Sequence, residues 1–196
     1  MTKKLRTGRP LRKRRRTPMA RTPRFVAPGR LIHARPAVVE QPARIGDWEG
    51  DLIVGRASRS VIGTLVDRRT GYLRLVHLPD GHSAEQLRVA MLPVLTDLPT
   101  PARQTLTWDH GSEMAYHHLL EEYFADGIFA PPASPWLRGT NENTNGLLRQ
   151  YFPKGSDLPG FTLADLRAVE QRINGRPRKR LAWRSPARVM ETELAG

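Results

Sequence analysis

The sequence predicts an α/β domain in which helices flank a mixed five-stranded sheet, and two patterns along the chain support this. Between residues 46 and 78, three strand-like runs follow one another closely, as they do in an antiparallel meander. Beyond residue 82, helical patterns alternate with two further strand-like runs, which is typical of sheets of mixed direction. The sequence contains no internal repeat of the kind that would indicate a solenoid.

Each strand is predicted from its own residues. The five runs are WEGDLIVG, SVIGTLVD, GYLRLVHL, QTLTWD and GIFAPPAS, in chain order. The third run alternates cleanly, with Tyr72, Arg74 and Val76 on one side. The segment DRRTG between the second and third runs has the composition of a hairpin turn, because Gly71 can adopt a positive φ.

The first helix is predicted from its start signal and its apolar spacing. Ser83 and Gln86 form a capping-box pattern, and apolar residues recur beyond them at helical intervals. Pro93 stands inside this pattern, so we expect the helix to kink there or to split in two.

Three more helices are expected beyond residue 111. The second should bury four residues at spacing i, i+3, i+4 and i+7: Tyr116, Leu119, Leu120 and Tyr123. The third begins near Thr140. The last begins near Thr162 and ends at Asn174 and Gly175.

The positive charge is concentrated at the N-terminus. The chain has a net charge of +13, and residues 1–39 contain 13 Lys and Arg with no acid. The other 157 residues hold 19 basic and 19 acidic side chains, so we divide the chain into a basic, largely extended or disordered arm (1–44), a globular core (45–175) and a basic C-terminal extension (176–196).

A nucleic acid is the favoured partner of this arm, because no apolar face accompanies the charge as it would in a membrane-binding helix. A solvated leader without a partner is the alternative. The run LRKRRRTP is dense in arginine, which favours DNA binding by Arg12, Lys13, Arg14, Arg15 and Arg16. The chain has no cysteine and no long apolar run, so we expect a cytoplasmic protein that associates with the cell's DNA and not with a membrane.

Three carboxylates on separate predicted elements resemble the ligands of a two-metal site. Asp51 lies on the first strand, Asp109 at the end of the fourth, and Glu142 on the third helix. Such a trio can hold two Mg²⁺ ions for phosphoryl transfer, because the cations offset the repulsion among the anions and polarise a phosphate. The spacing alone does not identify the chemistry.

Each of these acids also has a simpler interpretation. Asp47, Glu49 and Asp67 compete with Asp51, although Asp67 borders a turn where a carboxylate commonly caps the backbone. Asp109 could cap the following helix, and Glu142 could interact with the dipole of its own helix.

On a helical wheel, Asn145 and Arg149 fall beside Glu142, while Leu147, Leu148 and Tyr151 cluster on the opposite side. The helix should therefore pack with its apolar side and direct the polar side outward. We expect phosphate contacts, with a solvated face as the alternative, from Arg138, Asn141, Asn145, Arg149 and Lys154.

The segments GDWEGDLIVG, LTWDHGSEM and SPWLRGTNENTNGLLRQYFPKG closely resemble the three catalytic blocks of the IS30 family of bacterial insertion-sequence transposases. The resemblance runs from about Gly8 to Met190. It implies a ribonuclease H-like fold and a DDE triad with two divalent metal ions, which falls on Asp51, Asp109 and Glu142 in this sequence. The interval of 33 residues between the last two acids fits the family pattern.

Three features depart from that pattern, and one of them is Pro93 inside the first predicted helix. The family's usual N-terminal helix-turn-helix region has no counterpart in this sequence, and His110 stands where the family has Asn or Gln. The resemblance implies a DNA transposase, a polynucleotidyl transferase that cleaves and joins strands with Mg²⁺ or, in its place, Mn²⁺. Its partners would be transposon ends, a target duplex and further copies of itself. A catalytically silent remnant that binds DNA and a hydrolase of RNA–DNA hybrids are the alternatives.

Overall fold

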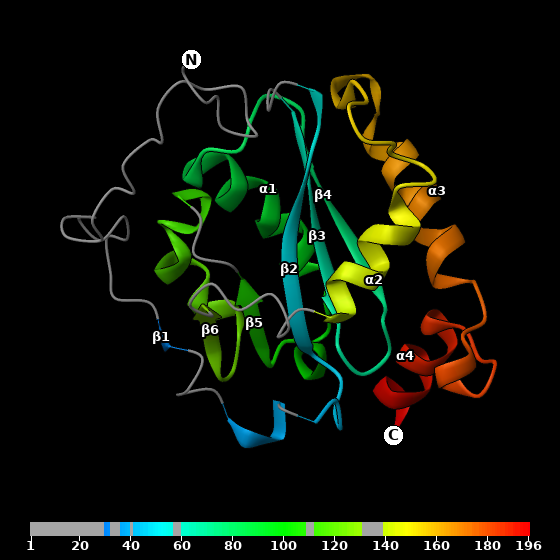
Figure 1. The fold of residues 1–196 in the computed structure, drawn as a ribbon. Helices are drawn as coiled ribbons and strands as arrows, with labels where there is room; N and C mark the ends of the chain where they lie inside the picture. Colours follow the sequence, from blue (N-terminus) through cyan, green and yellow to red (C-terminus); the bar gives the residue numbers. More distant parts are fainter. Residues whose placement is uncertain (1–29, 32–35, 40, 57–59, 109–111, 131–138) are drawn as a thin grey trace, which may run out of the picture.

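The computed structural model describes residues 30–31, 36–39, 41–56, 60–108, 112–130 and 139–196 (Figure 1). Within these residues, one sheet has the strand order β1-β6-β5-β2-β3-β4. Its strands are β1 (Arg30–Leu31), β2 (Asp47–Val54), β3 (Val61–Asp67), β4 (Leu73–Leu78), β5 (Thr105–Trp108) and β6 (Gly127–Ala130). The five predicted strands are therefore confirmed, and a two-residue strand is added at one edge.

The sheet has mixed direction, as predicted. β2, β3 and β4 form an antiparallel meander, whereas β5 runs parallel to both β2 and β6. The turn between β3 and β4 has the predicted hairpin character, with Gly71 at φ 70°. Asp67 accepts hydrogen bonds from the backbone N–H groups of Gly46 and Thr70, so it caps this turn as expected.

Helices cover both faces of the sheet (Figure 1). α1 (Ala84–Thr96) packs on one face, where Trp48, Leu65 and Leu106 belong to its core. α2 (Gly139–Leu148) and α3 (Leu163–Asn174) pack on the other face with a second core that includes Ile62 and Phe152. The alternation of side chains along the strands separates the two cores.

α1 begins with the predicted capping box of Ser83 and Gln86. It is not split at Pro93 but continues to Thr96, so that prediction is wrong in its stronger form. Pro93 is exposed and lies in the last turn, where its ring can face solvent. The buried side chains of Val94 and Leu95 keep this turn on the sheet.

The predicted second helix is wrong. Residues 112–123 instead form three 3₁₀ turns, η5 (Ser112–Met114), η6 (His117–Leu119) and η7 (Glu121–Tyr123). Met114, His117 and Leu120 are buried at intervals of three residues, which is the period of a 3₁₀ helix. Two side chains expected in the core, Tyr116 and Leu119, are 37% and 44% exposed.

α3 starts and stops where predicted, with a capping box of Thr162 and Asp165 and Gly175 at its C-cap. It also covers the free edge of β4. Asn174 accepts a hydrogen bond from the N–H of Leu73 and donates one to the carbonyl of the same residue. Glu170 accepts from the N–H of Leu75. These side chains occupy backbone groups that an edge strand would otherwise present to another chain.

The structure adds a helix, α4 (Pro186–Ala195), where the sequence predicted only a basic extension. Ser185 caps its N-terminus and Pro186 takes the first helical position, which is a start signal present in the sequence. Met190 is buried in the same core as α1. No helix in the described ranges has both the length and the apolar character that crossing a bilayer requires.

Candidate active site

Three carboxylates follow one another on a single face of β2. Asp47, Glu49 and Asp51 occupy alternate positions, so their side chains all point to the face that α2 covers. Trp48 lies on the opposite face, where its indole N–H donates to the carbonyl of Ala102 at 2.8 Å. The strand therefore combines a hydrophobic face with an acidic one.

The first two carboxylates are buried and receive hydrogen bonds from guanidinium groups. Asp47 is 1% exposed and accepts from Arg44 at 2.9 Å and from the hydroxyl of Thr105 at 2.8 Å. Glu49, also 1% exposed, accepts from Arg68 at 2.8 Å. Both partners offset the charge of a carboxylate that burial would otherwise penalise strongly.

Amide groups hold the third carboxylate. One oxygen of Asp51 accepts from its neighbour's backbone, Leu52 N–H, at 2.8 Å. The other oxygen accepts from the side-chain amide of Asn145 in α2 at 2.9 Å. Asp51 is partly exposed, whereas Asp47 and Glu49 are buried. It thus combines a fixed orientation with access to solvent.

Two further hydrogen bonds attach the beginning of α2 to the sheet. The second oxygen of Glu49 accepts from the backbone N–H of Asn141 at 2.9 Å, which satisfies one of the free donors at the helix start. The Asn141 side-chain oxygen accepts from the hydroxyl of Thr64, the residue paired with Asp51 on β3. α2 is therefore fixed at two successive turns, by Asn141 and by Asn145.

The chain segments that carry the three predicted carboxylates converge here. Gly50 is the register partner of Trp108, the last residue of β5, so Asp51 and Asp109 each come one residue later in the chain. Asp109 itself lies outside the described residues. Glu142 lies in α2, between the two asparagines that contact the sheet, although its side chain is also outside the description.

Several predicted DNA contacts fall on residues that the structure does not describe, namely Arg12, Lys13, Arg14, Arg15, Arg16 and Arg138. Of the others, Lys154 is exposed and Arg149 is partly exposed beyond α2. Asn145 is partly exposed and contacts Asp51. Asn141 differs from the prediction, because its side chain is only 1% exposed and faces β3. It positions the helix and does not present its amide to solvent.

The helical wheel correctly places Leu148 in the core, but it misses the polar part of the buried face. Asn141, Thr144 and Leu148 are all buried, at intervals of three and four residues. Asn and Thr at such positions do not register as an apolar stripe; hydrogen bonds attach Asn141 to Glu49 and Thr64, and the Thr144 hydroxyl donates to the carbonyl of Thr140.

Glu49 and Arg68 were not predicted to support the site. Glu49 was considered only as a competing ligand, and Arg68 only as part of a turn. The register of β2 and β3 brings them together, since Glu49 and Val66 are partners and Arg68 lies two residues further on. In the sequence, the one indication of this acidic strand face is the spacing of Asp47, Glu49 and Asp51 at alternate positions in DWEGD.

Asp51 supplies one oxygen ligand of the kind that a divalent cation binds. An oxygen ligand that is partly exposed and oriented by amides is what Mg²⁺ binds in proteins. Within the described residues, no cluster of three or more His, Cys, Asp or Glu side chains could hold a metal. Because Asp109 and the Glu142 side chain lie outside that set, the predicted triad stays a prediction.

Asp67, on the strand next to β2, has a raised pKa. Burial raises the pKa of Asp67 to about 6, although hydrogen bonds from Thr70 and Gly46 act in the opposite direction. Asp67 lies at the end of β3 and caps the turn, so its shift reflects a structural role.

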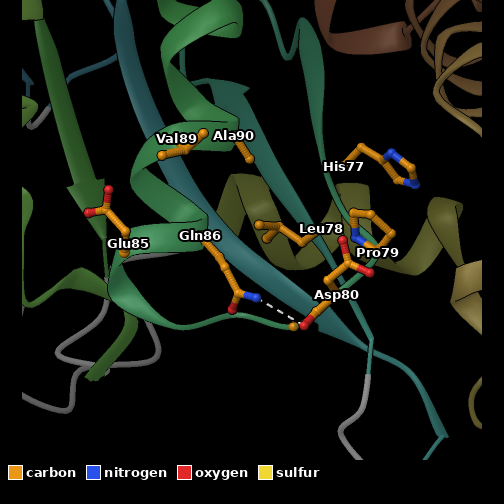
Figure 2. A pocket seen from close by; sticks show the side chains of 9 residues that line it. His77, Leu78, Pro79, Asp80, Glu85, Gln86, Val89 and Ala90 are labelled. Carbon is orange, nitrogen blue, oxygen red and sulfur yellow. Dashed lines mark hydrogen bonds between the residues drawn. The ribbon is translucent and has the colours of Figure 1, made fainter.

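A small cavity of about 270 Å³ opens between the end of β4 and the start of α1 (Figure 2). Gln86 crosses its rim and donates to the carbonyl of Asp80. None of the predicted site residues is among those that line it: His77, Leu78, Pro79, Asp80, Gly81, Glu85, Gln86, Val89 and Ala90. The cavity is therefore separate from the candidate site.

Comparison with solved structures supports the fold. The chain superposes on the catalytic core domain of BIV integrase with a TM-score of 0.56 and 17% sequence identity, over 76% of this chain and 97% of that one. At this identity the likeness concerns the fold alone, which is the predicted ribonuclease H-like, integrase-core fold.

Sequence comparison identifies the family, although no family model matches the chain. The chain is 47% identical over 167 residues to the transposase for insertion sequence element IS1086 of Cupriavidus metallidurans, covering 84% of this chain and 48% of the relative. It is 42% identical to the transposase InsI for IS30A of Escherichia coli, covering 85% and 43%. The IS4351 transposase of Bacteroides fragilis is 37% identical, covering 81% and 49%. The chain spans about half the length of these relatives and, by its sequence, belongs to the family of IS30-type transposases.

Proposed function

We propose that this chain is the catalytic part of a DNA transposase, which cleaves a strand at the end of an insertion sequence and joins the free 3′-hydroxyl to target DNA. Identities of 37–47% to transposases over more than 80% of the chain support a role in DNA transposition. In the same proposal, the active species is a homo-oligomer that holds two DNA ends.

In this proposal Asp51, Asp109 and Glu142 hold two Mg²⁺ ions, and Mn²⁺ can replace them. The supporting observation is the convergence of β2, the end of β5 and α2, with Asn145 of α2 donating to Asp51. When bound, the ions supply positive charge that stabilises the negative charge developing on the scissile phosphate.

The remaining residues of the site hold these ligands in place. Asn145 fixes the orientation of the Asp51 carboxylate, and Glu49 holds the start of α2 against β2. Arg149 and Lys154 follow α2 on the accessible side, where their charges suit phosphate contacts. The basic arm would add contacts that do not depend on DNA sequence.

The test is cleavage and strand transfer by the purified chain on pre-cut and uncut oligonucleotides from the ends of its insertion sequence. Asp51→Asn, Asp109→Asn and Glu142→Gln should each lower both rates by at least about 10²–10³-fold in Mg²⁺ or Mn²⁺. Asp157→Asn is the matched control, because Asp157 is exposed and makes no side-chain capping bond.

Activity of Asp51→Asn equal to that of the control would refute the assignment. DNA binding that survives chelation, without nicking in either metal, would instead support a catalytically silent DNA-binding protein. Cleavage of RNA–DNA hybrids alone would support the hydrolase alternative.

A further inference from the structure

The segment between α3 and α4 forms a rigid, strongly basic turn. Residues 176–188 contain six Lys and Arg and no acid. The turn closes on itself through hydrogen bonds from Arg178 N–H to the carbonyl of Arg184 and from Trp183 N–H to the carbonyl of Arg178, both at 3.0 Å. Leu181 is buried beneath it, so the turn is anchored to the domain. We call residues 176–184 the basic turn.

The basic turn docks on the hairpin between β3 and β4. Arg180 donates to the carbonyl of Arg69 at 3.2 Å, and Arg69 forms an ion pair with Glu193 of α4 at 3.2 Å. The neighbouring residue in that hairpin, Arg68, contacts Glu49 of the candidate active site. The hairpin residues Arg69 and Arg68 therefore connect the basic turn to Glu49 on the acidic face of β2.

Trp183 projects from this turn into solvent. Its exposed fraction is 70%, the highest among the described large hydrophobic residues, whereas Trp48 and Trp108 are at most 1% exposed. Ala182 and Trp183 both have left-handed backbones, with φ of 52° and 64°. Non-glycine residues in this region store strain, and the surrounding hydrogen bonds maintain it. An exposed indole on a strained, well-held turn is a contact surface and not a core residue.

The cations around Trp183 are incompletely paired. Nε and Nη2 of Arg178 are buried and have no hydrogen-bond partner within the described part of the chain. Burial lowers the pKa of Arg178, and the nearby charges of Arg180 and Arg176 lower it further. The half-buried guanidinium of Arg178 thus lies among like charges with unsatisfied donors, a setting that a nearby anion would stabilise.

We propose that the basic turn binds an unpaired stretch of DNA, with Trp183 stacking on a base while Arg176, Arg178 and Lys179 contact the adjacent phosphates. The proposal rests on the proposed function, which makes DNA the substrate. Base faces are covered inside a stacked duplex, so an indole stacks most readily where nucleotides are unpaired, as at a cleaved or frayed end. The five Lys and Arg of the basic turn favour a polyanion over a protein surface.

The experiment measures binding of a labelled oligothymidylate of about 12 nucleotides to the full chain in EDTA, by fluorescence anisotropy, next to a duplex of equal length. Trp183→Ala should raise the Kd for the oligothymidylate by about 5- to 150-fold and change duplex affinity far less. Trp183→Phe keeps an aromatic face and should retain most of the affinity. The wild-type chain should show quenching of tryptophan emission on binding, and Trp183→Phe should lose that quenching.

Arg178→Gln should flatten the dependence of log K on log salt by about 0.7 for the single strand. Tyr116→Ala and Arg88→Gln are the matched controls, because Tyr116 is also exposed and Arg88 lies on α1 in an ion pair with Glu85. Both controls should bind the oligothymidylate like the wild type.

Equal Kd values for Trp183→Ala and the wild type, with unchanged emission, would overturn the proposal. So would a Trp183→Ala variant whose oligomeric state changes in sedimentation while its DNA affinity does not, since Trp183 would then contact a protein. If the wild-type chain cleaves DNA and Trp183→Ala binds the oligothymidylate as tightly as the wild type, this inference is wrong while the proposed function stands. If Trp183→Ala weakens oligothymidylate binding but the wild-type chain cleaves no DNA, the catalytic proposal is wrong while this inference stands.

Discussion

Asp47, Glu49 and Asp51 show how residues of like charge on one strand face acquire different roles. Guanidinium groups of Arg44 and Arg68 donate to the first two, which are buried, and amides hold the third at the accessible end of the row. Arg44 and Arg68 compensate the charges of Asp47 and Glu49, whereas the amide donors at Asp51 are neutral groups. The partners, and not the residue type, thus distinguish Asp51.

Asp67 should make folding stability depend on pH. Burial raises its pKa from 3.8 to about 6, so between these values the folded chain binds more protons at this site than the unfolded chain. Stability should therefore fall as pH rises through this window, by about 3 kcal/mol from this group. Urea unfolding from pH 4 to 7 should show that the difference in unfolding free energy between wild type and Asp67→Asn decreases accordingly. A pH-independent difference would contradict the shift.

Gly50 is required by close contact with Trp108. A Cβ at Gly50 would lie 1.9 Å from the Trp108 ring, which is itself fully buried. Gly50→Ala should therefore destabilise the fold by about 1–3 kcal/mol, because either the indole or the pairing of β2 with β5 must shift. Urea or thermal unfolding measures this.

Gly146 provides the matched control in α2, since a Cβ there meets no atom within 4 Å. Gly146→Ala should stabilise the protein by about 0.5–1 kcal/mol through lower backbone entropy of the unfolded chain. Similar effects of the two substitutions would argue against the tight contact at Gly50.

Among the elements, α2 has the most direct relation to the candidate site. The sequence of α2, GTNENTNGLL, has few apolar residues on either side of the helix. Hydrogen bonds of Asn141 and Asn145 attach it to the sheet, and the buried side chain of Leu148 anchors its end. A helix attached in this way to an acidic strand is positioned by hydrogen bonds, whose geometry is more specific than that of hydrophobic contact.

Asn145→Ala should test this positioning. Without the amide, Asp51 loses the donor that orients it, so we expect strand cleavage to slow by about 10- to 100-fold. The Mg²⁺ concentration for half-maximal rate should rise as well, which a purely structural role would not cause. Asn143→Ala is the control, because Asn143 is exposed on the same helix. Equal rates and equal Mg²⁺ dependence in the two variants would exclude the role.

At the scale of the whole molecule, the excess positive charge is concentrated at the N-terminal end of the sequence. The excess of 13 positive charges equals the 13 Lys and Arg of residues 1–39, while the rest of the chain is balanced. A balanced domain with a basic arm can bind DNA strongly without distorting the electrostatics of its own core.

Removal of residues 1–29, which hold 11 of these Lys and Arg and end before β1 and the buried Val39, should therefore flatten the salt dependence of duplex binding by several units, at about 0.9 per phosphate neutralised. Affinities measured from 50 to 300 mM salt for the full and shortened chains test this. The unfolding free energy of the domain serves as the control and should change little. An identical slope would mean that the arm makes no phosphate contacts.

Local chemistry made much of the architecture predictable. The strands, the capping boxes of α1 and α3 and the turn at Gly71 all follow from short-range patterns that the structure confirms. Prediction failed where local patterns were ambiguous. The spacing of Tyr116, Leu119, Leu120 and Tyr123 fits an α-helix as well as successive 3₁₀ turns, and packing against β6 and α1 decided between them.

The sequence by itself determined the strand order along the chain, the basic arm and the three acidic segments that identify the family, because these depend on residue type and spacing. Only the tertiary structure decided which of the β2 acids is neutralised, that Asn141 faces inward, and that Trp183 stands exposed on the basic turn. Those outcomes depend on strand register and on contacts between residues 77 to 111 positions apart, such as Thr64 with Asn141 and Arg69 with Arg180. Spacing along a chain contains no direct record of such contacts.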